Sequence, residues 1–511
     1  MTQQFTNLYT ASQVRELDRL AIEEAGIPGY SLMKKAGASA FHYIMSIWPA
    51  TRKMTVFCGT GNNGGDGYVI AKLAKIRGLD VKVIQLGDIS IQSGDALTAR
   101  KELIAEGRSD DLIIEHFSTE FDPKSLLDDE VIVDALLGIG LQRDVNGLWE
   151  IAINVINQSK AKVASVDIPS GLNSDTGVVQ GVAVKADISI TFIGRKQGMY
   201  TASGRDVCGD IIFESLNIPQ TAFHKVGYSS QCLPLTISDS FLKPRKRNSH
   251  KGSYGNILLI GGSPGMNGAI LLSAIAALRT GCGLVTVLTH PDHAAYLNIN
   301  QPEVMCRGIE TPEQLEKYMS AADVVVIGPG LGTDIWGRNL IEAVVRTNKP
   351  LVIDADGLNN LASETLSSCK SANANWVLTP HPGEAGKLLN CSIDEIQSNR
   401  FDAAKQISEK YNAVCALKGA GTIIYFQNKT YVCAAGNPGM ATAGMGDVLS
   451  GILGTLIAQT QTTVIDAVNN AVSLHALAGD NVARLSGEKG MLASDLFPEV
   501  RRILNGVQHA C

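Results

Sequence analysis

An aspartate at the start of a glycine-rich helix is well placed for acid–base chemistry. Asp447 ends the run Asn437–Asp447 and leads into a helix predicted over Val448–Leu456. Gly444 and Gly446 stand beside it, and the N-terminus of a helix can neutralise negative charge on a transferred phosphoryl group. A carboxylate at the same point can take a proton from a hydroxyl group. The alternative is structural, because aspartate is also a preferred N-cap residue.

Four predicted strands of the second half end in polar or glycine-rich segments. Such loops, followed by a helix N-terminus, form cradles for phosphate groups and other ligands. The segments are Gly261–Ala269, Gly328–Gly332, Asp354–Gly357 and Thr379–Glu384. Lys418–Thr422 follows a further predicted strand, Ala413–Leu417, and its lysine and glycines suit contact with a nucleotide phosphate.

The first half carries its own glycine loop. The predicted strand Met54–Cys58 runs into Gly59–Gly67, with the sequence GTGNNGGDG, and a helix is predicted from Tyr68. The glycines allow a tight turn and close approach of the backbone to a phosphate. The asparagine and aspartate oxygens can bind a ligand hydroxyl or a cation. The alternative is a network of Asx turns.

Two further aspartates end predicted strands of the first half. Asp134 precedes the loop LLGIGLQRD, and Asp167 begins the sequence DIPSG. Since the carboxyl ends of parallel strands share the ligand edge of a sheet, both carboxylates are expected beside the asparagine-rich loop. They can do general acid–base work there. The alternative is that either aspartate only caps a turn.

Alternating strands and helices must position these groups. An opening helix is predicted over Thr10–Ala25, with Thr10 and Gln13 as a capping box. Continuous apolar runs, typical of buried parallel strands, follow at Met54–Cys58, Val81–Leu86, Val131–Leu136, Lys162–Val166 and Ile188–Phe192. The first half is therefore predicted to be a Rossmann-like, doubly wound α/β sheet.

A proline-rich region interrupts this rhythm between Asn217 and Asn248 and marks a domain boundary near residues 220–240. We expect domains over 1–225 and 226–511. The basic run Lys243–Arg247 is interpreted as a solvated linker face, with phosphate binding as the alternative. A second α/β series then begins, with strands predicted at Asn256–Ile260, Leu284–Leu288, Val324–Ile327, Leu351–Ile353 and Trp376–Leu378.

Composition limits the class of protein. The 511 residues are 45% hydrophobic and 18% charged, which suits buried cores, and their net charge of -6 argues against nucleic acid as a partner. The N-terminal residues show no signal peptide, and the most apolar stretch, Ala269–Leu278, is too short to span a membrane. The ten cysteines show no metal-ligand spacing. A cytoplasmic enzyme without membrane contact is expected.

The first half resembles the NAD(P)H-hydrate epimerase family through YTASQVRELD, LMKKAG, GNNGGDG, VDALLGIG and DIPSGL, over about residues 8–225. The resemblance implies that Asp167 is the catalytic and substrate-binding acid. It also implies a potassium ion among Asn63, Asp134 and Ser170, residues with the hard oxygen donors that suit such a cation. The other implied substrate-binding residues are Asn62, Asn63, Gly64, Gly65, Asp66, Gly138, Ile139, Gly140, Leu141, Gln142, Arg143 and Asp144.

The second half resembles the ribokinase-like superfamily, and within it the ADP-dependent NAD(P)H-hydrate dehydratases. HKGSYG, GPGLG, DADGLN, TPHPGE, LKGAGT and NPGMATAGMGDVLSG carry this resemblance over about residues 235–505. Met445 departs from the small residue more usual in the loop but leaves Asp447 intact. The resemblance implies that Ala269, Gly330, His381 and Asp447 bind the hydrated cofactor. The implied nucleotide-binding residues are Lys418, Gly419, Ala420, Gly421, Thr422 and Gly446.

The two resemblances together imply a repair enzyme for hydrated NADH and NADPH. The first domain is expected to interconvert the R and S hydrates, and the second to dehydrate the S form with ADP or ATP, giving AMP and phosphate from ADP. Catalysis is assigned to Asp167 and Asp447, with potassium in the first domain and magnesium with the nucleotide in the second. A homo-oligomer is expected. The alternative is a small-molecule kinase with an N-terminal NAD(P)-binding regulatory domain.

Overall fold

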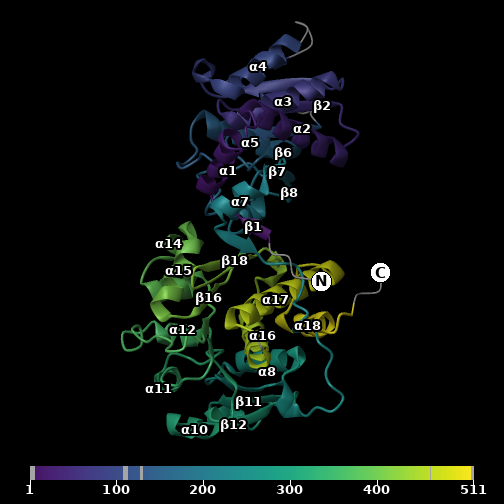
Figure 1. Ribbon diagram of the computed structural model, residues 1–511. Helices are drawn as coiled ribbons and strands as arrows, with labels where there is room; N and C mark the ends of the chain where they lie inside the picture. Colours follow the sequence, from purple (N-terminus) through teal and green to yellow (C-terminus); the bar gives the residue numbers. More distant parts are fainter. Residues whose placement is uncertain (1–5, 107–112, 127–129, 461, 508–511) are drawn as a thin grey trace. The chain divides into compact units, whose positions relative to one another are not determined.

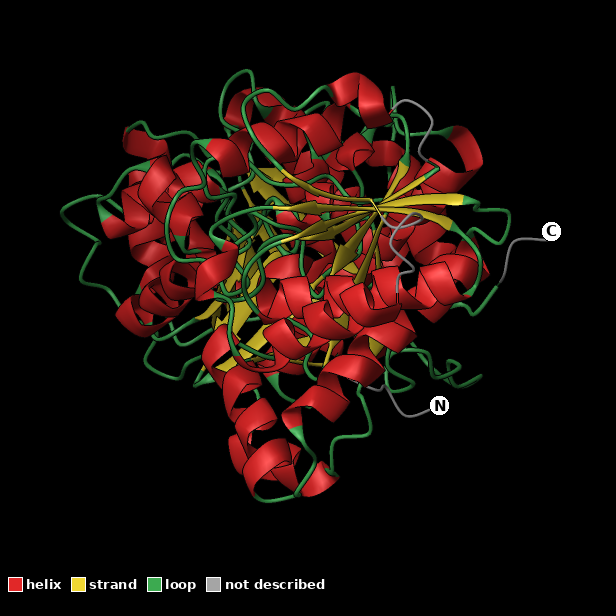
Figure 2. Cartoon of the chain, turned by 90° about the horizontal axis from the view of Figure 1, so that it is seen from above, coloured by secondary structure: helices red, strands yellow, loops and turns green. Residues whose placement is uncertain are grey.

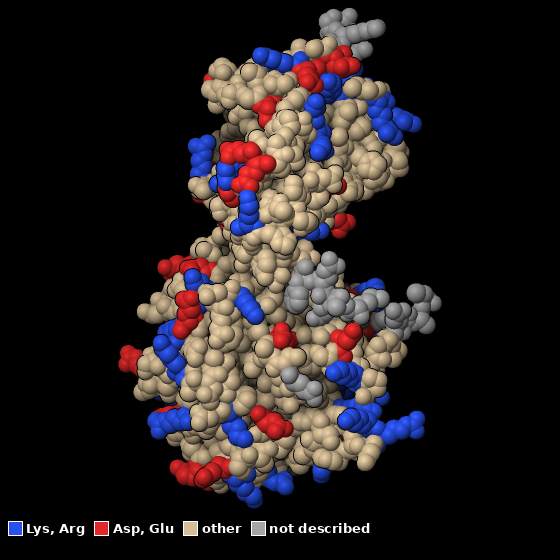
Figure 3. Space-filling model, in the orientation of Figure 1, with Lys and Arg blue, Asp and Glu red and all other residues tan. Residues whose placement is uncertain are grey.

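A computed structural model describes residues 6–106, 113–126, 130–460 and 462–507. These residues divide into two compact units. Asn7–Ser230 form the unit here called the N-terminal domain, and the residues from Gln231 onward, together with Thr6, form the unit here called the C-terminal domain. Each is described by itself. On the face drawn in Figure 3, acidic and basic side chains are interspersed on both domains.

The N-terminal domain is built on a parallel sheet of seven strands in the order β4-β3-β2-β5-β6-β7-β8. Its strands are β2 (Lys53–Cys58), β3 (Asp80–Gln85), β4 (Ile113–His116), β5 (Val131–Ala135), β6 (Lys162–Val166), β7 (Ile188–Phe192) and β8 (Asp210–Glu214). Its helices are α1 (Ala11–Glu23), α2 (Gly29–Ile47), α3 (Asn62–Ile76), α4 (Gly94–Glu106), α5 (Leu148–Gln158), α6 (Gly204–Val207) and α7 (Gln220–Val226).

Helices cover both faces of this sheet. The buried side chains of α1 to α4 pack on one face, and those of α5 pack on the other. The chain winds outward in opposite directions from β2 and from β5, which are neighbours. The predicted doubly wound sheet is confirmed, and the point between β2 and β5 where the winding reverses is the usual ligand crevice of such a fold.

The C-terminal domain has a larger mixed sheet. Parallel strands lie in the order β16-β15-β14-β13-β10-β11-β12, and β17 and β18 continue the sheet beyond β16 as an antiparallel hairpin. Strand β9 pairs with β18, and the short β1 (Thr6–Leu8) lies beyond β9 at the edge of the sheet. The strands are β9 (Ser230–Cys232), β10 (Asn256–Ile260), β11 (Leu284–Thr289), β12 (Met305–Gly308), β13 (Val324–Ile327), β14 (Leu351–Ile353), β15 (Trp376–Leu378), β16 (Val414–Leu417), β17 (Thr422–Phe426) and β18 (Lys429–Cys433).

Two helical layers enclose this second sheet, and Figure 2 shows strands fanning out between helices. One layer is α8 (Asn267–Thr280), α16 (Met445–Gln459), α17 (Val464–Ser486) and α18 (Leu496–Leu504), which lie together in Figure 1. The other is α10 (Glu316–Met319), α11 (Ile335–Val345), α12 (Asp356–Leu361), α13 (Pro382–Leu389), α14 (Ile393–Ser398) and α15 (Arg400–Tyr411). A short α9 (Pro291–Ala294) precedes β12.

The predicted starts of two helices were wrong. Helix α3 begins at Asn62, with Gly61 as its N-cap, and not at Tyr68. Helix α16 begins at Met445, with Gly444 as its N-cap, and not at Val448. In both cases the glycines that were interpreted as a loop lie in the first turns of the helix, where they permit close packing.

Local signals explain the elements that the sequence did predict. Thr10 and Gln13 form the predicted capping box of α1, and the buried face of that helix includes Val14, Leu17 and Leu20. In the part of the chain that the structure describes, no helix has the length and apolarity needed to cross a membrane.

Candidate functional sites

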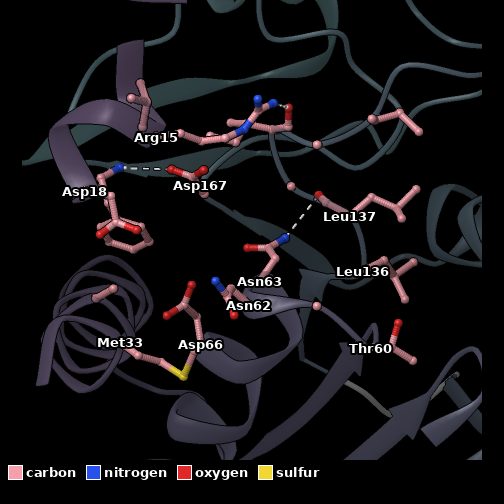
Figure 4. A pocket seen from close by; sticks show the side chains of 18 of the residues that line it. Arg15, Asp18, Met33, Thr60, Asn62, Asn63, Asp66, Leu136, Leu137 and Asp167 are labelled. Carbon is pink, nitrogen blue, oxygen red and sulfur yellow. Dashed lines mark hydrogen bonds between the residues drawn. The ribbon is translucent and has the colours of Figure 1, made fainter. Parts of the chain in front are cut away.

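A cavity of about 810 Å³ opens at the carboxyl ends of β2 and β5. This volume lies in the range of small-molecule sites. Of the residues that the resemblance assigned to substrate, the cavity is lined by Asn62, Asn63, Asp66, Gly138, Ile139, Gly140, Leu141, Gln142, Arg143, Asp144 and Asp167. In Figure 4 the carboxyl groups of Asp18, Asp66 and Asp167 face the same space.

Gly64 and Gly65 are buried and do not appear among the residues lining this cavity. A Cβ atom on Gly65 would lie 2.6 Å from Met33 of α2, and one on Gly64 would meet the carbonyl oxygen of Gly59. These glycines therefore bring α3 close to its neighbours, which places Asn63 and Asp66 at the cavity wall.

Asp167 stands in an unusual backbone conformation. Its φ is 68°, and the N–H of Ile168 donates to the carbonyl of Val166 at 2.8 Å, which makes a γ-turn centred on Asp167. Ile193 repeats this arrangement at the end of the adjacent strand β7, with φ 66° and a 2.7 Å bond from Gly194 N to Phe192 O. Positive φ at non-glycine residues costs about 1–3 kcal/mol each and is concentrated at functional sites.

A buried lysine lies behind Asp167. The Nζ of Lys196 donates to Asp167 Oδ1, to Thr191 Oγ1 at 2.9 Å and to Phe192 O at 3.0 Å. Lys196 is fully buried, whereas the Asp167 side chain is 17% exposed. Burial lowers the pKa of Lys196, and the Asp167 carboxylate opposes this shift. Lys196 thus fixes one carboxylate oxygen and leaves the other side of Asp167 facing the cavity.

Other carboxyl groups around the cavity hold protons more tightly than usual. Burial raises the pKa of Asp66 well above its ordinary value, and the charges of Asp167 and Asp18 add to the rise. Burial also raises the pKa of Asp18. The cavity can therefore present a protonated carboxyl group beside Asp167, which is the combination that acid–base catalysis requires.

The three residues implied for potassium lie together. Asp134 Oδ1 accepts from Ser170 Oγ at 2.6 Å. Asn63 Nδ2 donates to the carbonyl oxygen of Leu137 at 3.1 Å, and Ser170 Oγ lies 3.2 Å from the same oxygen. Burial raises the pKa of Asp134, in part offset by its hydrogen bonds. Asn63 Oδ1 is buried and has no hydrogen-bond partner among the described residues. A buried oxygen without a partner, in a cluster that also contains the Asp134 carboxylate, fits a hard cation.

In the C-terminal domain, the segments that follow β14, β15 and β16 and the start of α16 meet at a charged cluster. Lys418, directly after β16, donates to Asp354 Oδ1 at 2.7 Å and lies 3.8 Å from Glu384 Oε2. Ser450 of α16 donates to Asp354 Oδ2 at 2.7 Å. A Cβ atom on Gly446 would lie 3.2 Å from Lys418 Nζ, so the loop after β16 and the start of α16 are in contact.

Asp447 lies at the third position of α16, within this cluster. Gly444 is the N-cap and, among the described residues, no side-chain hydrogen bond caps the helix. The capping interpretation of Asp447 is therefore wrong. Burial raises the pKa of Asp447 to about 7, with Asp354 adding to the rise and Lys418 opposing it. A carboxyl group that titrates near neutral pH suits a general base.

The residues implied for the hydrated cofactor lie around the same helix start. Ser273 of α8 donates to the carbonyl of Asp447 at 2.6 Å, and Ala269 lies one turn earlier on α8. A Cβ atom on Gly330 would lie 3.3 Å from Cβ of Ala269. His381 is the N-cap of α13, and its Nδ1 accepts from Gly383 N at 3.0 Å.

Several residues of the N-terminal site were missed in the sequence. Lys196 is the clearest case, although a charged residue so close to the buried strand β7 was a usable signal. Arg15 and Asp18 of α1 and Asp95 of α4 also line the cavity. Nothing in the sequence places these helix residues near β5, because that proximity arises only from the packing of helices on the sheet.

The chain matches two family models, one described as NAD(P)H-hydrate dehydratase over residues 257–502 and one described as YjeF-related protein N-terminus over residues 29–198. The bifunctional NAD(P)H-hydrate repair enzyme of Coxiella burnetii is 45% identical over 501 residues, covering 98% of this chain and 100% of that protein. Its counterpart from Escherichia coli is 40% identical over 500 residues, covering 98% and 94%.

A crystal structure of the ADP/ATP-dependent NAD(P)H-hydrate dehydratase from Bacillus subtilis, co-crystallized with ATP/Mg²⁺, is 27% identical. It covers 51% of this chain and 92% of that chain, with a TM-score of 0.45.

A doubly wound domain with a ligand cavity, joined to a domain with a charged cluster at a helix start, defines a two-domain α/β enzyme. The chain belongs to the family of bifunctional NAD(P)H-hydrate repair enzymes. It is a multifunctional enzyme with an epimerase and a dehydratase domain. The alternative of a plain kinase with a regulatory domain is not supported.

Proposed function

We propose that the N-terminal domain, residues 1–225, epimerises the hydrates of NADH and NADPH at Asp167, and that residues 226–511 dehydrate the S hydrate at Asp447. Hydration of a reduced nicotinamide ring creates a hydroxyl-bearing carbon that can have either the R or the S configuration. A chiral pocket consumes one form, so an epimerase lets the dehydratase consume both. The observation that best supports the division is that each domain brings one of these aspartates to its own ligand edge.

In the epimerase, inversion of the hydroxyl-bearing carbon requires one bond to break and re-form, with one proton removed and one returned. Asp167, oriented by Lys196, takes the role of base. A protonated carboxyl group in the same cavity, such as Asp66, can return the proton. Asn62, Gly138 to Asp144 and the start of α3 would hold the dinucleotide.

Potassium is proposed at Asn63, Asp134 and Ser170, and its fit depends on the unpaired Asn63 Oδ1. When bound there it would supply positive charge close to the asparagine-rich turn. The test is to remove K⁺ by dialysis and measure both epimer exchange and the melting temperature. The proposal expects K⁺, and not an equal concentration of the smaller Li⁺, to restore both, and expects Asn63→Ala to abolish this dependence.

In the dehydratase, Asp447 takes the proton of the substrate hydroxyl while that oxygen receives the terminal phosphoryl group of the nucleotide. Phosphate then leaves with the electron pair of the C–O bond, and loss of a proton from the neighbouring carbon restores the ring double bond. With ADP the products are AMP, phosphate and NAD(P)H. The start of α16 faces the transferred group with N–H donors.

The proposed nucleotide contacts are Lys418, Gly419, Ala420, Gly421, Thr422 and Gly446. Gly419 and Gly421 have φ of 145° and 65°, conformations that expose successive backbone groups on one side of a loop and suit anion binding. Magnesium is proposed to enter with the ADP or ATP, because this ion is commonly held by substrate phosphates with few protein ligands. Ala269, Gly330 and His381 would then hold the hydrated cofactor.

We also propose a cytoplasmic location and a homo-oligomer, with no nucleic acid or membrane as partner. The cysteines of the described residues are free thiols, as a reducing compartment favours. Light scattering after size exclusion tests the oligomeric state.

The function is tested with purified protein, resolved hydrate epimers and MgADP. Asp167→Asn should lose epimer exchange and retain dehydration of the S hydrate, whereas Asp447→Asn should do the reverse. Loss of both activities in either folded variant would contradict the proposed division.

A further inference from the structure

One cation of the C-terminal domain is buried without an acidic partner. Arg400, the first residue of α15, is 2% exposed. Its Nη2 donates to the carbonyl oxygens of Leu417, Lys418 and Gly421 at 3.3–3.4 Å, and its Nη1 donates to Gln397 Oε1 at 3.1 Å. Among the described residues its Nε has no partner.

The charge of Arg400 is not balanced by protein groups nearby. No carboxylate of the described residues forms an ion pair with it within 4.0 Å. Burial alone lowers the pKa of Arg400, to about 10, so the side chain is still a cation at neutral pH. An isolated buried charge is costly, and such groups are normally paired.

Arg400 lies directly behind the loop Lys418–Thr422. A Cβ atom on Gly419 would lie 2.5 Å from Arg400 Nη1, and Gly419 and Ala420 are themselves exposed. Only the thin glycine backbone separates the guanidinium from the side of the loop that faces solvent. Through such a low-dielectric layer, an anion on the loop would be attracted more strongly than in water.

Lys418 cannot supply this attraction alone. Its Nζ is already engaged by Asp354 at 2.7 Å and lies 3.8 Å from Glu384, with Asp447 also contributing to its raised pKa. The cluster around Lys418 thus contains the carboxyl groups of Asp354, Glu384 and Asp447 but only one ammonium group. A phosphate chain placed there needs a further positive charge.

We propose that Arg400 is a positioning residue of the nucleotide loop, whose missing counter-charge is the phosphate chain of the bound nucleoside diphosphate. The inference rests on the proposed nucleotide site and adds to it a source of selectivity. Because the attraction grows with the charge of the phosphate chain, Arg400 favours a diphosphate over the monophosphate product.

The test compares binding of MgADP and AMP to the full chain by calorimetry. Arg400→Met keeps length and volume but removes the charge, so we expect MgADP affinity to fall by about tenfold and AMP affinity by clearly less. The melting temperature without nucleotide should hold or rise, because an apolar residue replaces an unpaired buried charge. Arg346→Met, at the exposed C-cap of α11, is the matched control and should change neither the nucleotide affinities nor the melting temperature.

A purely structural role predicts a different pattern. It would lower the melting temperature and weaken MgADP and AMP by the same factor, and that result would overturn the proposal. If Arg400→Met does not fold, the same comparison of MgADP and AMP binding is made with Arg400→Lys and Arg400→Gln. The lysine variant should keep the ADP-to-AMP affinity ratio and the glutamine variant should lose it, and equal ratios would overturn the proposal.

The proposed nucleotide site itself is checked by Lys418→Met. Wild-type protein that binds no MgADP would overturn both proposals. Binding that depends on Lys418 but not on Arg400 would overturn only the role of Arg400.

Discussion

Asp447 shows how position, more than residue type, creates a catalytic group. Aspartate near a helix start is usually a cap, but here Gly444 occupies the cap position and the carboxyl group is free to face the cluster around Lys418. Burial and Asp354 raise its pKa to about 7, so a substantial share of the molecules carries the ionised form at neutral pH.

The first prediction follows from that titration. Asp447→Asn should lower the rate of dehydration by about 10²- to 10⁴-fold, the usual contribution of a general base. In the wild type, kcat should fall as the pH drops below about 7, because protonated Asp447 cannot accept the hydroxyl proton. The measurement is NAD(P)H absorbance from the S hydrate with saturating MgADP, from pH 5.5 to 8.5. A flat profile would exclude Asp447 as the base.

The same group gives a second prediction, on stability. Since the pKa of Asp447 is raised on folding, the folded chain binds this proton more tightly than the unfolded chain does. Its contribution to stability is therefore largest below the unfolded value and is lost as the pH rises toward about 7. Asp447→Asn should remove that loss. In urea unfolding, the free energy of unfolding of the variant, relative to that of the wild type, should therefore be higher at pH 8 than at pH 5.

The third prediction concerns the pair of Asp167 and Lys196. Removing one partner of a buried ion pair costs about 3–5 kcal/mol, because the other charge is left without compensation. Lys196 is fully buried, so Asp167→Asn should destabilise the N-terminal domain, and the double variant with Lys196→Met should recover part of that loss. The free energies of unfolding of the wild type, the two single variants and the double variant, measured with denaturant, give the coupling energy between Asp167 and Lys196. Strictly additive losses would show that the two groups do not interact.

At the scale of elements, glycines set how closely α3 approaches the sheet. A Cβ atom on Gly67 would lie 2.7 Å from Ala135 Cβ and 2.8 Å from Cys58 Sγ. The helix therefore rests on β2 and β5, and its first turn carries Asn63 to the site. The NNGGDG motif combines ligand groups with packing groups, which is why it could be misread as a loop.

The fourth prediction separates these two roles. Gly67→Ala should cost about 1–3 kcal/mol through overpacking and should lower epimer exchange, because α3 must shift. Gly61→Ala is the control from the same motif. Its φ is -88° and a Cβ atom there meets nothing within 4 Å. The weaker N-capping by alanine, about 0.5–1 kcal/mol, is then offset by the lower entropy of the unfolded alanine chain, so the net cost should be only a few tenths of a kcal/mol. Equal effects in chemical denaturation would contradict the packing argument.

Central strands were predicted more reliably than edge strands. β6, β7, β10, β13, β14 and β15 have the predicted limits, since each is buried on both faces and reads as a continuous apolar run. The edge strands β4 and β12 were missed because their open side tolerates polar residues, such as Glu115 and Arg307. The turn of the β17–β18 hairpin is formed by Gln427 and Asn428, a weaker turn signal than Asn-Gly.

At the scale of the whole molecule, motifs far apart in sequence become one site only through strand order. Asp354 and Lys418 are 64 residues apart, yet β14 and β16 lie on either side of β15. The sequence showed that each loop follows a strand, and hence that the loops share one edge. It could not show the pairing of Lys418 with Asp354 or the burial of Arg400, because both depend on packing between distant segments.

The two domains each have their own sheet and their own hydrophobic core. The fifth prediction is that residues 1–230 and 231–511, expressed separately, each fold and retain one activity. The C-terminal fragment with MgADP should convert only the S hydrate of an epimer mixture, because its chiral site accepts one hand. Adding the N-terminal fragment should allow the remaining R hydrate to be consumed at a rate set by epimer exchange. Absorbance and chiral chromatography follow the two steps.

If the C-terminal fragment consumed both epimers unaided, the epimerase would not be needed for repair. If the fragments were folded but inactive even when mixed, each site would need its covalently linked neighbour, and the assignment of one self-contained site to each domain would be wrong.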